Sequence, residues 1–187
     1  NPVFKAAEQE LTRSFKELST QEMPPYFISY TITDKKTTSI SAGNGLIDVC
    51  RVQENRIFDL DLRTGNYMFD NSHIIRGNDG SMSYLQLVEL PMTNDIAVLR
   101  NHMWIQTDRA YKAAIERYEK ARSNKAVKVA EEDSSADFSK EKASIYFGEE
   151  KQLTIDTAAW AKRLKRLSAK FNLYPDIYNS SLLNLSR

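Results

Sequence analysis

The sequence predicts a mixed α/β fold of the α+β type, in which a largely antiparallel sheet packs with two or three long helices. Three stretches repeat apolar residues at three- and four-residue steps, which is the helical period. Between the first two of them, apolar and polar residues alternate, with turn signals about ten residues apart, as in antiparallel strands. A chain of 187 residues with 41% hydrophobic residues is long and apolar enough to bury a core without disulfides.

Composition excludes several classes of function. Lys and Arg total 26 and Asp and Glu total 25, so the net charge of +1 argues against a large field for nucleic acid or anionic membrane. No stretch approaches the roughly 20 apolar residues of a membrane helix, so no membrane insertion is expected. Two His and one Cys exclude an internal disulfide and a zinc site made of His and Cys alone.

The first half should hold one helix and four short strands. Residues 2–19 form an amphipathic helix that Pro24 and Pro25 stop. Strands are expected at 26–33, 37–42, 46–53 and 57–63, with turns at 34–36, 43–45 and 54–55. In the first strand Tyr26, Ile28, Tyr30 and Ile32 share a face, and in the last Phe58, Leu60 and Leu62 do.

The second half should hold two long helices. A loop at 70–83 precedes a short apolar strand or extended segment at 85–90. A helix follows from 96 to about 121, with Thr93, Asn94 or Asp95 as its cap. The charged stretch 122–142 reads as a mobile linker, followed by a short strand at 144–147. Asp156 caps a helix from 157 to about 171, and a closing strand runs over 177–186.

Few residues are candidates for chemistry. Cys50 lies in an apolar strand and is interpreted as a buried small hydrophobe. His73 suits a loop-bonding role and His102 a packing role in its helix. Asp59 and Asp61, on one strand face, are either a cation or acid/base pair or the solvated side of the strand.

Two further patterns favour structural interpretations. The basic side chains of Lys162, Arg163, Lys165 and Arg166 suit a solvated helix face better than binding to lipid or RNA. Tyr26, Phe27 and Tyr30 favour core packing over base stacking, because no basic strand lies between them.

Five segments occur in an order that resembles a known family. They are MPPYFISY at 23–30, RTGNYMFDN at 63–71, WIQTDRAYK at 104–112, FSKE at 138–141 and WAKRLKRLSAKF at 160–171. Together they resemble the amino-terminal part of TldD/PmbA proteins, named as modulators of DNA gyrase and regarded as zinc-dependent peptidases. The likeness covers nearly the whole chain and is greatest to the long, exported members in Bacteroides-like bacteria.

The resemblance implies an amino-terminal domain over 1–187, with helices on a curved sheet. The family's H-E-x-x-x-H motif and downstream Cys ligand do not occur in this chain, so no catalytic or metal-ligating residue is assigned to it and the substrate-binding residues are unknown. Zinc would lie in a carboxy-terminal part of the full-length protein, and the chain alone is expected to be inactive. Implied partners are that carboxy-terminal domain, a second family member in a homo- or heterodimer, and peptide substrates, with no nucleic acid.

Other expectations concern the ends of the chain, its compartment and two alternative functions. The first residue is not Met, so we expect that a signal peptide, a tag or a cloning boundary precedes Asn1. The closing strand would lack a partner, so we expect the natural chain to continue after Arg187. Export to the periplasm or cell envelope is expected, with the cytoplasm as alternative. The rival functions are a free-standing peptide- or protein-binding module and a small hydrolase built on Asp59, Asp61 and His73.

Overall fold

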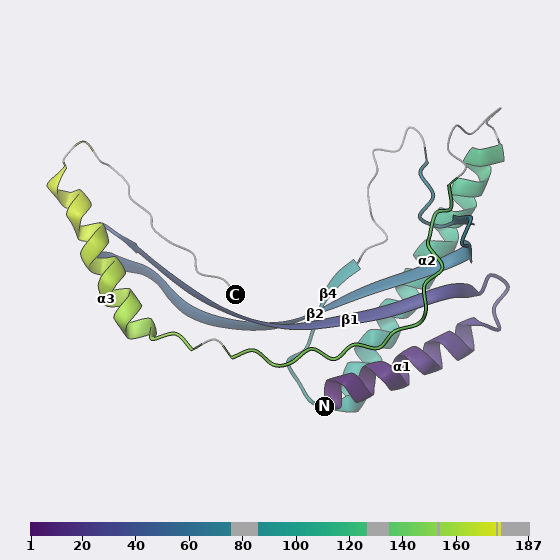
Figure 1. The fold of residues 1–187 in the computed structure, drawn as a ribbon, viewed down its shortest axis with the longest axis horizontal. Coiled ribbons are helices and arrows are strands. Elements are labelled where there is room, and N and C mark those ends of the chain that lie inside the picture. The colour runs from purple at the N-terminus through teal and green to yellow at the C-terminus, as the bar shows by residue number, and fades with distance from the viewer. Residues whose placement is uncertain (76–85, 127–134, 153, 175, 177–187) are drawn as a thin grey trace. The chain divides into compact units, whose positions relative to one another are not determined.

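A computed structural model of the protein describes residues 1–75, 86–126, 135–152, 154–174 and 176 (Figure 1). The elements are α1 (Pro2–Leu18), β1 (Pro25–Gly43), β2 (Leu46–Asn66), β3 (Phe69–Asp70), β4 (Gln86–Leu90), α2 (Ile96–Ala126), α3 (Thr157–Ser168) and a 3-10 helix, η1 (Ala169–Leu173). The chain divides into unit 1, residues 1–33 and 56–145, and unit 2, residues 34–55 and 146–187. Each unit is described by itself.

The sheet is antiparallel and open, as the sequence predicts. In the described residues it has four strands, with β2 between β1 and β3 and with β4 also paired to β2. Arg56 of β2 lies opposite Leu90 of β4, and Gly65 lies opposite Asp70 of β3. With three helices in addition, this is the predicted α+β class, and a sheet that does not close fits the expected curvature.

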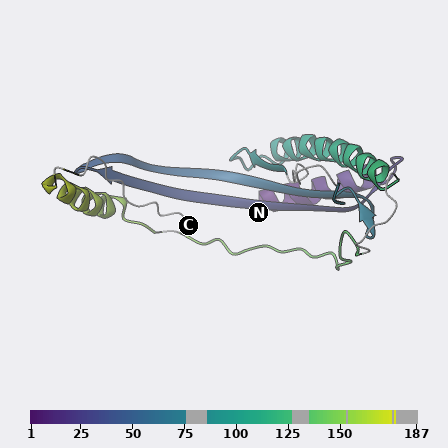
Figure 2. The same cartoon turned by 90° about the horizontal axis from the view of Figure 1, so that it is seen from above.

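The core of unit 1 lies between the sheet and two helices. α1 and α2 pack against each other, and both views show them side by side (Figure 1, Figure 2). The buried face of β2 carries the alternating side chains that the sequence predicts, Phe58, Leu60 and Leu62. They meet Leu99 and Met103 of α2, both fully buried, with Ile28, Tyr30 and Ile32 of β1 packed around them. The period of two in the strands therefore does place one face in the core.

Polar side chains join α1, α2 and β1 inside this core. Glu10 of α1 is 2% exposed and accepts hydrogen bonds from Arg13, Ser14 and Arg100 of α2. The Tyr30 hydroxyl bonds Thr107 of α2. Since a buried carboxylate requires compensating partners, these bonds fix how α1 lies on α2.

Local capping explains where the helices begin. The Asn1 side chain accepts from the Val3 and Phe4 amides, with Pro in the first turn of α1. Asp95, one of the three caps expected for α2, accepts from the amides of Ala97 and Val98. Each cap satisfies amides that have no partner within the helix.

Unit 2 pairs the tip of the β1–β2 hairpin with α3. Asp156 caps α3 as predicted, accepting from the Ala159 amide at 2.9 Å. Leu164, with Trp160 and Ala161, packs on Ile40 and Ala42 of β1. At the predicted hairpin turn, Asn44 and Gly45 both have positive φ, 49° and 83°, which is the pattern of a type I′ turn.

Several predicted boundaries are wrong. The turns expected at 34–36 and 54–55 do not form, because β1 and β2 run continuously through them. These stretches hold charged residues without Gly or Pro, and both strands are exposed there, so Lys36 and Glu54 remain in strands and pair at 2.6 Å. The four short strands are thus two long ones.

The later boundaries also shift. α2 continues to Ala126, so the expected linker at 122–142 begins inside a helix. Residues 144–147 are exposed and form no strand. β4 confirms a strand within 85–90, and α3 ends at Ser168, with η1 in place of its last predicted turn. The closing strand at 177–186 lies outside the described residues.

Candidate functional site

A cluster of polar and aromatic side chains in unit 1 lies where β2 turns into β3. Gly65, with φ of 106°, directs the chain into this tight connection, where a Cβ would lie 2.5 Å from the Phe69 carbonyl oxygen. The buried Asn71 closes it: its Oδ1 accepts from the Thr64 amide at 2.8 Å, and its Nδ2 donates to the Leu62 carbonyl. The connection is therefore held rigidly to the end of β2.

Asp70 is the fully buried centre of this cluster. Its Oδ2 accepts from the Tyr26 hydroxyl at 2.6 Å and from Arg63 at 3.1 Å. Its Oδ1 accepts from the Ser72 amide and hydroxyl, each at 2.6 Å. Four donors, of which Arg63 is a full cation, compensate the buried Asp70 carboxylate, so the group orders this end of the sheet.

Arg63 joins Asp70 to the outer face of β2. Its Nε donates to Asp61 at 3.0 Å, and it also donates to the Ser72 hydroxyl at 3.1 Å. Burial raises the pKa of Asp61 above the ordinary range although the Arg63 charge lowers it. Burial, reinforced by the hydrogen bond to Asp70, likewise raises the pKa of Tyr26, so this hydroxyl remains a donor at neutral pH.

A distant segment docks onto this cluster through Asp137 and Phe138. The Asp137 carboxylate accepts from the Asp70 amide at 2.8 Å and contacts His73 Nδ1 at 2.8 Å. The Phe138 amide donates to the Tyr67 carbonyl at 3.1 Å. The Phe138 ring lies 3.8 Å from the Arg63 guanidinium carbon, a cation–π contact.

The Asp137–His73 pair does not form a catalytic triad with the neighbouring Ser72. In a triad the histidine takes the proton of the nucleophilic hydroxyl. Here the Ser72 hydroxyl donates its single proton to Asp70 and accepts from Arg63. The cluster is therefore arranged for holding and binding chain segments, with no activated nucleophile in this geometry.

The predicted hydrolase residues do not come together as one site. Asp61 pairs with Arg63, and His73 bonds Asp137, a loop-bonding role as expected. Asp59 Oδ1 is buried and has no hydrogen-bond partner among the residues that the structure describes. Sequence reasoning did not assign roles to Arg63, Asp70, Asp137 or Phe138, although the quoted segments RTGNYMFDN and FSKE contain three of them.

The remaining predicted residues lie elsewhere. Cys50 is exposed on β2, which corrects its interpretation as buried, because every residue from 46 to 54 is exposed. His102 Nδ1 lies 3.0 Å from the Val98 carbonyl within α2. Lys162, Arg163, Lys165 and Arg166 are exposed on α3, with Arg163 over the Trp160 ring, while Tyr26, Phe27 and Tyr30 are part-buried in packing.

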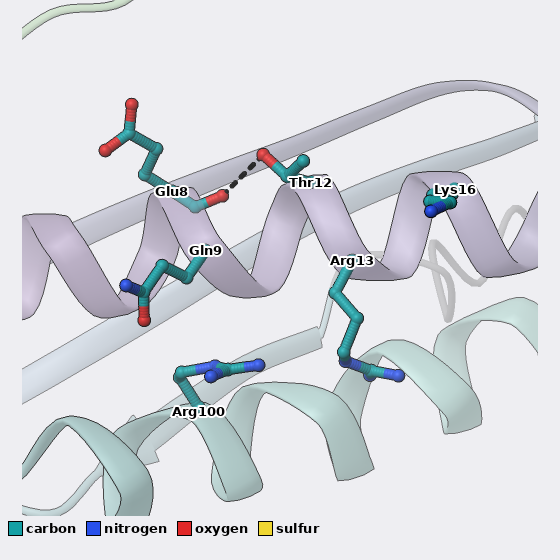
Figure 3. A pocket seen from close by; sticks show the side chains of 6 residues that line it. All are labelled: Glu8, Gln9, Thr12, Arg13, Lys16 and Arg100. Carbon is teal, nitrogen blue, oxygen red and sulfur yellow. Dashed lines mark hydrogen bonds between the residues drawn. The ribbon is translucent and has the colours of Figure 1, made fainter.

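A second candidate is a shallow hollow between α1 and α2, lined by Glu8, Gln9, Thr12, Arg13, Lys16 and Arg100 (Figure 3). Thr12 is bonded to the Glu8 carbonyl, and the Arg13 side chain extends from α1 toward α2 (Figure 3). Both arginines already bind the buried Glu10. Their charge is thus compensated within the protein, and the hollow is too open to enclose a ligand.

The described ranges hold neither a cluster of metal-ligating side chains nor a helix suited to a membrane. In the part of the chain that the structure describes, no three His, Cys, Asp or Glu side chains gather as a metal site would require. None of the described helices is both long and apolar enough to cross a bilayer.

Comparison with known proteins identifies no relative: no family model, no curated protein and no solved structure matches this chain.

Proposed function

We propose that this chain is the amino-terminal, non-catalytic domain of a zinc-dependent peptidase of the TldD/PmbA type, where it contributes to a substrate cleft and to a dimer. One observation carries the proposal. Four of the five segments that resemble the family, though up to about a hundred residues apart, contact one another in unit 1. Segments that were quoted separately for the resemblance thus lie together in one part of the structure.

The contacts run from segment to segment. Tyr26 of MPPYFISY bonds Asp70 of RTGNYMFDN at 2.6 Å. Tyr111 of WIQTDRAYK donates to the Met23 carbonyl at 3.1 Å. Phe138 of FSKE lies against Phe27, with ring centroids 4.8 Å apart, and under Arg63. Each contact uses a side chain in the quoted motif, so the motifs support one another physically.

The fifth segment belongs to unit 2. WAKRLKRLSAKF spans most of α3 and η1, and its Trp160 and Leu164 cover Ile40 and Ala42. Its Ser168 hydroxyl accepts from the Gly45 amide at 3.0 Å. The segment therefore has a structural role at the hairpin tip, consistent with a domain that supplies walls to a cleft.

Peptide substrates would be engaged through the sheet. Among the described strands β1 is the outermost on its side, so its edge is available to an added strand. An extended peptide binds such an edge through main-chain hydrogen bonds. The proposal places zinc and catalysis in a carboxy-terminal part, a second family member in the dimer, and the protein in the periplasm or cell envelope; nucleic acid is not a proposed partner.

The coding sequence beyond Arg187 tests the proposal directly. We expect it to continue and to encode H-E-x-x-x-H followed far downstream by Cys. A continuation without that motif would refute the assignment.

Metal content tests whether zinc binds outside residues 1–187. The purified chain, loaded with zinc and then dialysed, should retain far less than one zinc per chain and should not hydrolyse unfolded peptides. The same measurement on the longer product is the control, with one zinc expected per chain. A ratio near one zinc per chain for residues 1–187 alone would contradict the proposal, because it would place the metal in this domain and not in the carboxy-terminal part.

The rival function, a free-standing peptide- or protein-binding module, has one observation in its favour. The β2 part of the hairpin exposes apolar side chains on both faces, Leu46 and Val52 on one and Ile47 and Val49 on the other, at 37–66% of their surface, and such exposed apolar side chains could contact a partner. A natural stop codon close to Arg187 would favour this function over the peptidase domain.

A further inference from the structure

Within segment 135–140, Asp137 and Phe138 supply the hydrogen bonds and ring contacts to the end of β2 described above, and the Lys140 ammonium lies 6.0 Å from the Tyr67 ring centroid. Asp137 and Phe138 are part-buried, whereas Ser135, Ala136 and every residue from 139 to 152 are exposed. Asp137 and Phe138 lie 64 or more residues from the sheet residues that they contact, so local chain geometry does not impose the contact. The part-buried residues of this segment are thus a single dipeptide.

The surface that receives this dipeptide has two complementary parts. We call it the Asp-Phe socket and define it by Tyr26, Phe27, Arg63, Tyr67, Asp70 and His73. Its polar part is the Asp70 amide and His73 Nδ1, which contact the two carboxylate oxygens of Asp137 at 2.8 Å each. This pair matches one short acidic side chain, because a longer carboxylate would be displaced by about 1.5 Å.

The aromatic part of the socket encloses the Phe138 ring. Arg63 covers one face at 3.8 Å, Phe27 meets the ring edge-on at 4.8 Å, and Tyr67 lies parallel to it at 6.3 Å. The Phe138 amide donates to the Tyr67 carbonyl, so the main chain is fixed as well. Side chain and backbone are recognised together, as in a peptide-binding site.

Two central residues of the socket, Arg63 and Asp70, are held by bonds to residues outside the segment. Arg63 is held by Asp61, Asp70 and Ser72, and Asp70 by Tyr26 and Ser72, none of which belongs to segment 135–140. Release of Asp137 and Phe138 would therefore leave this part of the site preformed, which lowers the cost of binding a replacement.

We propose that the Asp-Phe socket is a binding site for short peptides that contain Asp followed by an aromatic residue, and that residues 135–140 occupy it as a detachable strap. The inference goes beyond the proposed function, because it requires neither zinc nor a downstream domain. The tethered strap competes with free peptide at an effective concentration of the order of millimolar.

A peptide titration tests the proposal. The probe is the acetylated and amidated hexapeptide Ser-Ala-Asp-Phe-Ser-Lys, followed by chemical-shift changes of the Asp70 amide in the full 187-residue chain. The variant carrying Asp137→Ala and Phe138→Ala should bind it with a dissociation constant of the order of 1 mM or lower. The unchanged chain should bind about fivefold or more weakly, because its own strap fills the socket.

Three controls make the titration decisive. The hexapeptide with Ala in place of both Asp and Phe should not bind, and the one with Glu in place of Asp should bind more weakly. Absence of binding to a variant whose circular dichroism matches the unchanged chain would overturn the proposal, as would equal binding to both proteins.

Hydrogen exchange tests detachment without any variant. The amides of Asp70 and Phe138 should exchange together and about tenfold or more faster than the Asn71 amide, which bonds the Thr64 carbonyl. Protection of the Asp70 and Phe138 amides equal to that of Asn71 would mean that the segment opens only when unit 1 unfolds, and the strap would be refuted.

Discussion

Replacement of Gly65 by Ala should destabilise unit 1 strongly. The residue has φ of 106°, and a Cβ there would meet the Phe69 carbonyl oxygen at 2.5 Å and Tyr118 Cε2 at 2.6 Å. The Tyr118 ring can turn, but the Phe69 carbonyl belongs to the backbone of β3, whose pairing with β2 depends on its position. The conflict therefore cannot be relieved by a side-chain rotation alone.

The size of the effect follows from two costs and one gain. A non-Gly residue at this φ costs about 1–3 kcal/mol, and overpacking of a closed site costs a further 1–3 kcal/mol or so. Ala restricts the unfolded chain and returns about 0.4–1 kcal/mol. We therefore expect the free energy of unfolding to fall by about 3 kcal/mol.

Urea unfolding of unit 1 measures this loss. The chain has two Trp residues, Trp104 in α2 and Trp160 in α3, so a Trp160→Phe background isolates the fluorescence of unit 1. At a slope of about 1–3 kcal/mol per molar urea, the midpoint should fall by roughly 1–3 M.

The matched control for this variant is Gly148→Ala. A Cβ there meets only Tyr146 side-chain atoms, at 3.4 Å or more, so the change should stay within about 0.5 kcal/mol. If Gly65→Ala unfolds at the same urea concentration as the control, the argument from φ and close contact is wrong.

Three other substitutions test separate parts of the structure. Asp156→Ala should lower the stability of α3 by about 1 kcal/mol, read from Trp160 fluorescence, because the Ala159 amide loses its cap; an unchanged midpoint would contradict the role of the cap. Burial raises the pKa of Tyr30, so the folded state retains a proton that the unfolded chain loses near about pH 10. Stability should therefore fall as pH rises above that value, by about 1 kcal/mol per pH unit from this residue, and Tyr30→Phe should show a shallower slope than the unchanged chain. Burial also raises the pKa of Asp61, so its contribution to the free energy of unfolding is most favourable at acid pH and is lost as pH rises through the folded pKa. The stability of Asp61→Asn relative to the unchanged chain should therefore be higher at pH 7 than near pH 4. The reverse trend in urea unfolding would refute the burial argument.

Local signals predicted the parts of the fold that local physics decides. Alternation placed Phe58, Leu60 and Leu62 in the core, and the caps at Asp95 and Asp156 follow from side chains that bond amides two or three residues away. The Asn44–Gly45 turn was predictable because both residue types tolerate positive φ.

The cluster at the end of β2 could not be predicted in the same way. Asp137 pairs with His73 across 64 residues, and nothing in the charged stretch around Asp137 marks it as a partner. The length of the hairpin was missed because Asp34 and Asn55 are common in turns, whereas exposed strands accept them as well. Long-range pairing and exposed strand length depend on the tertiary structure, which periodicity does not report.

Unit 2 is built from two segments far apart in the sequence, residues 34–55 and 146–187, and this affects how it folds during synthesis. Ile40 and Ala42 leave the ribosome about 120 residues before Leu164, which covers them in the folded protein. At about 5–20 residues per second, the nascent hairpin tip would wait roughly 6–25 s for α3. During that interval its apolar face is open to ribosome-associated chaperones and to neighbouring nascent chains, so variants that slow the emergence of α3 should lower the soluble yield more than the equilibrium stability.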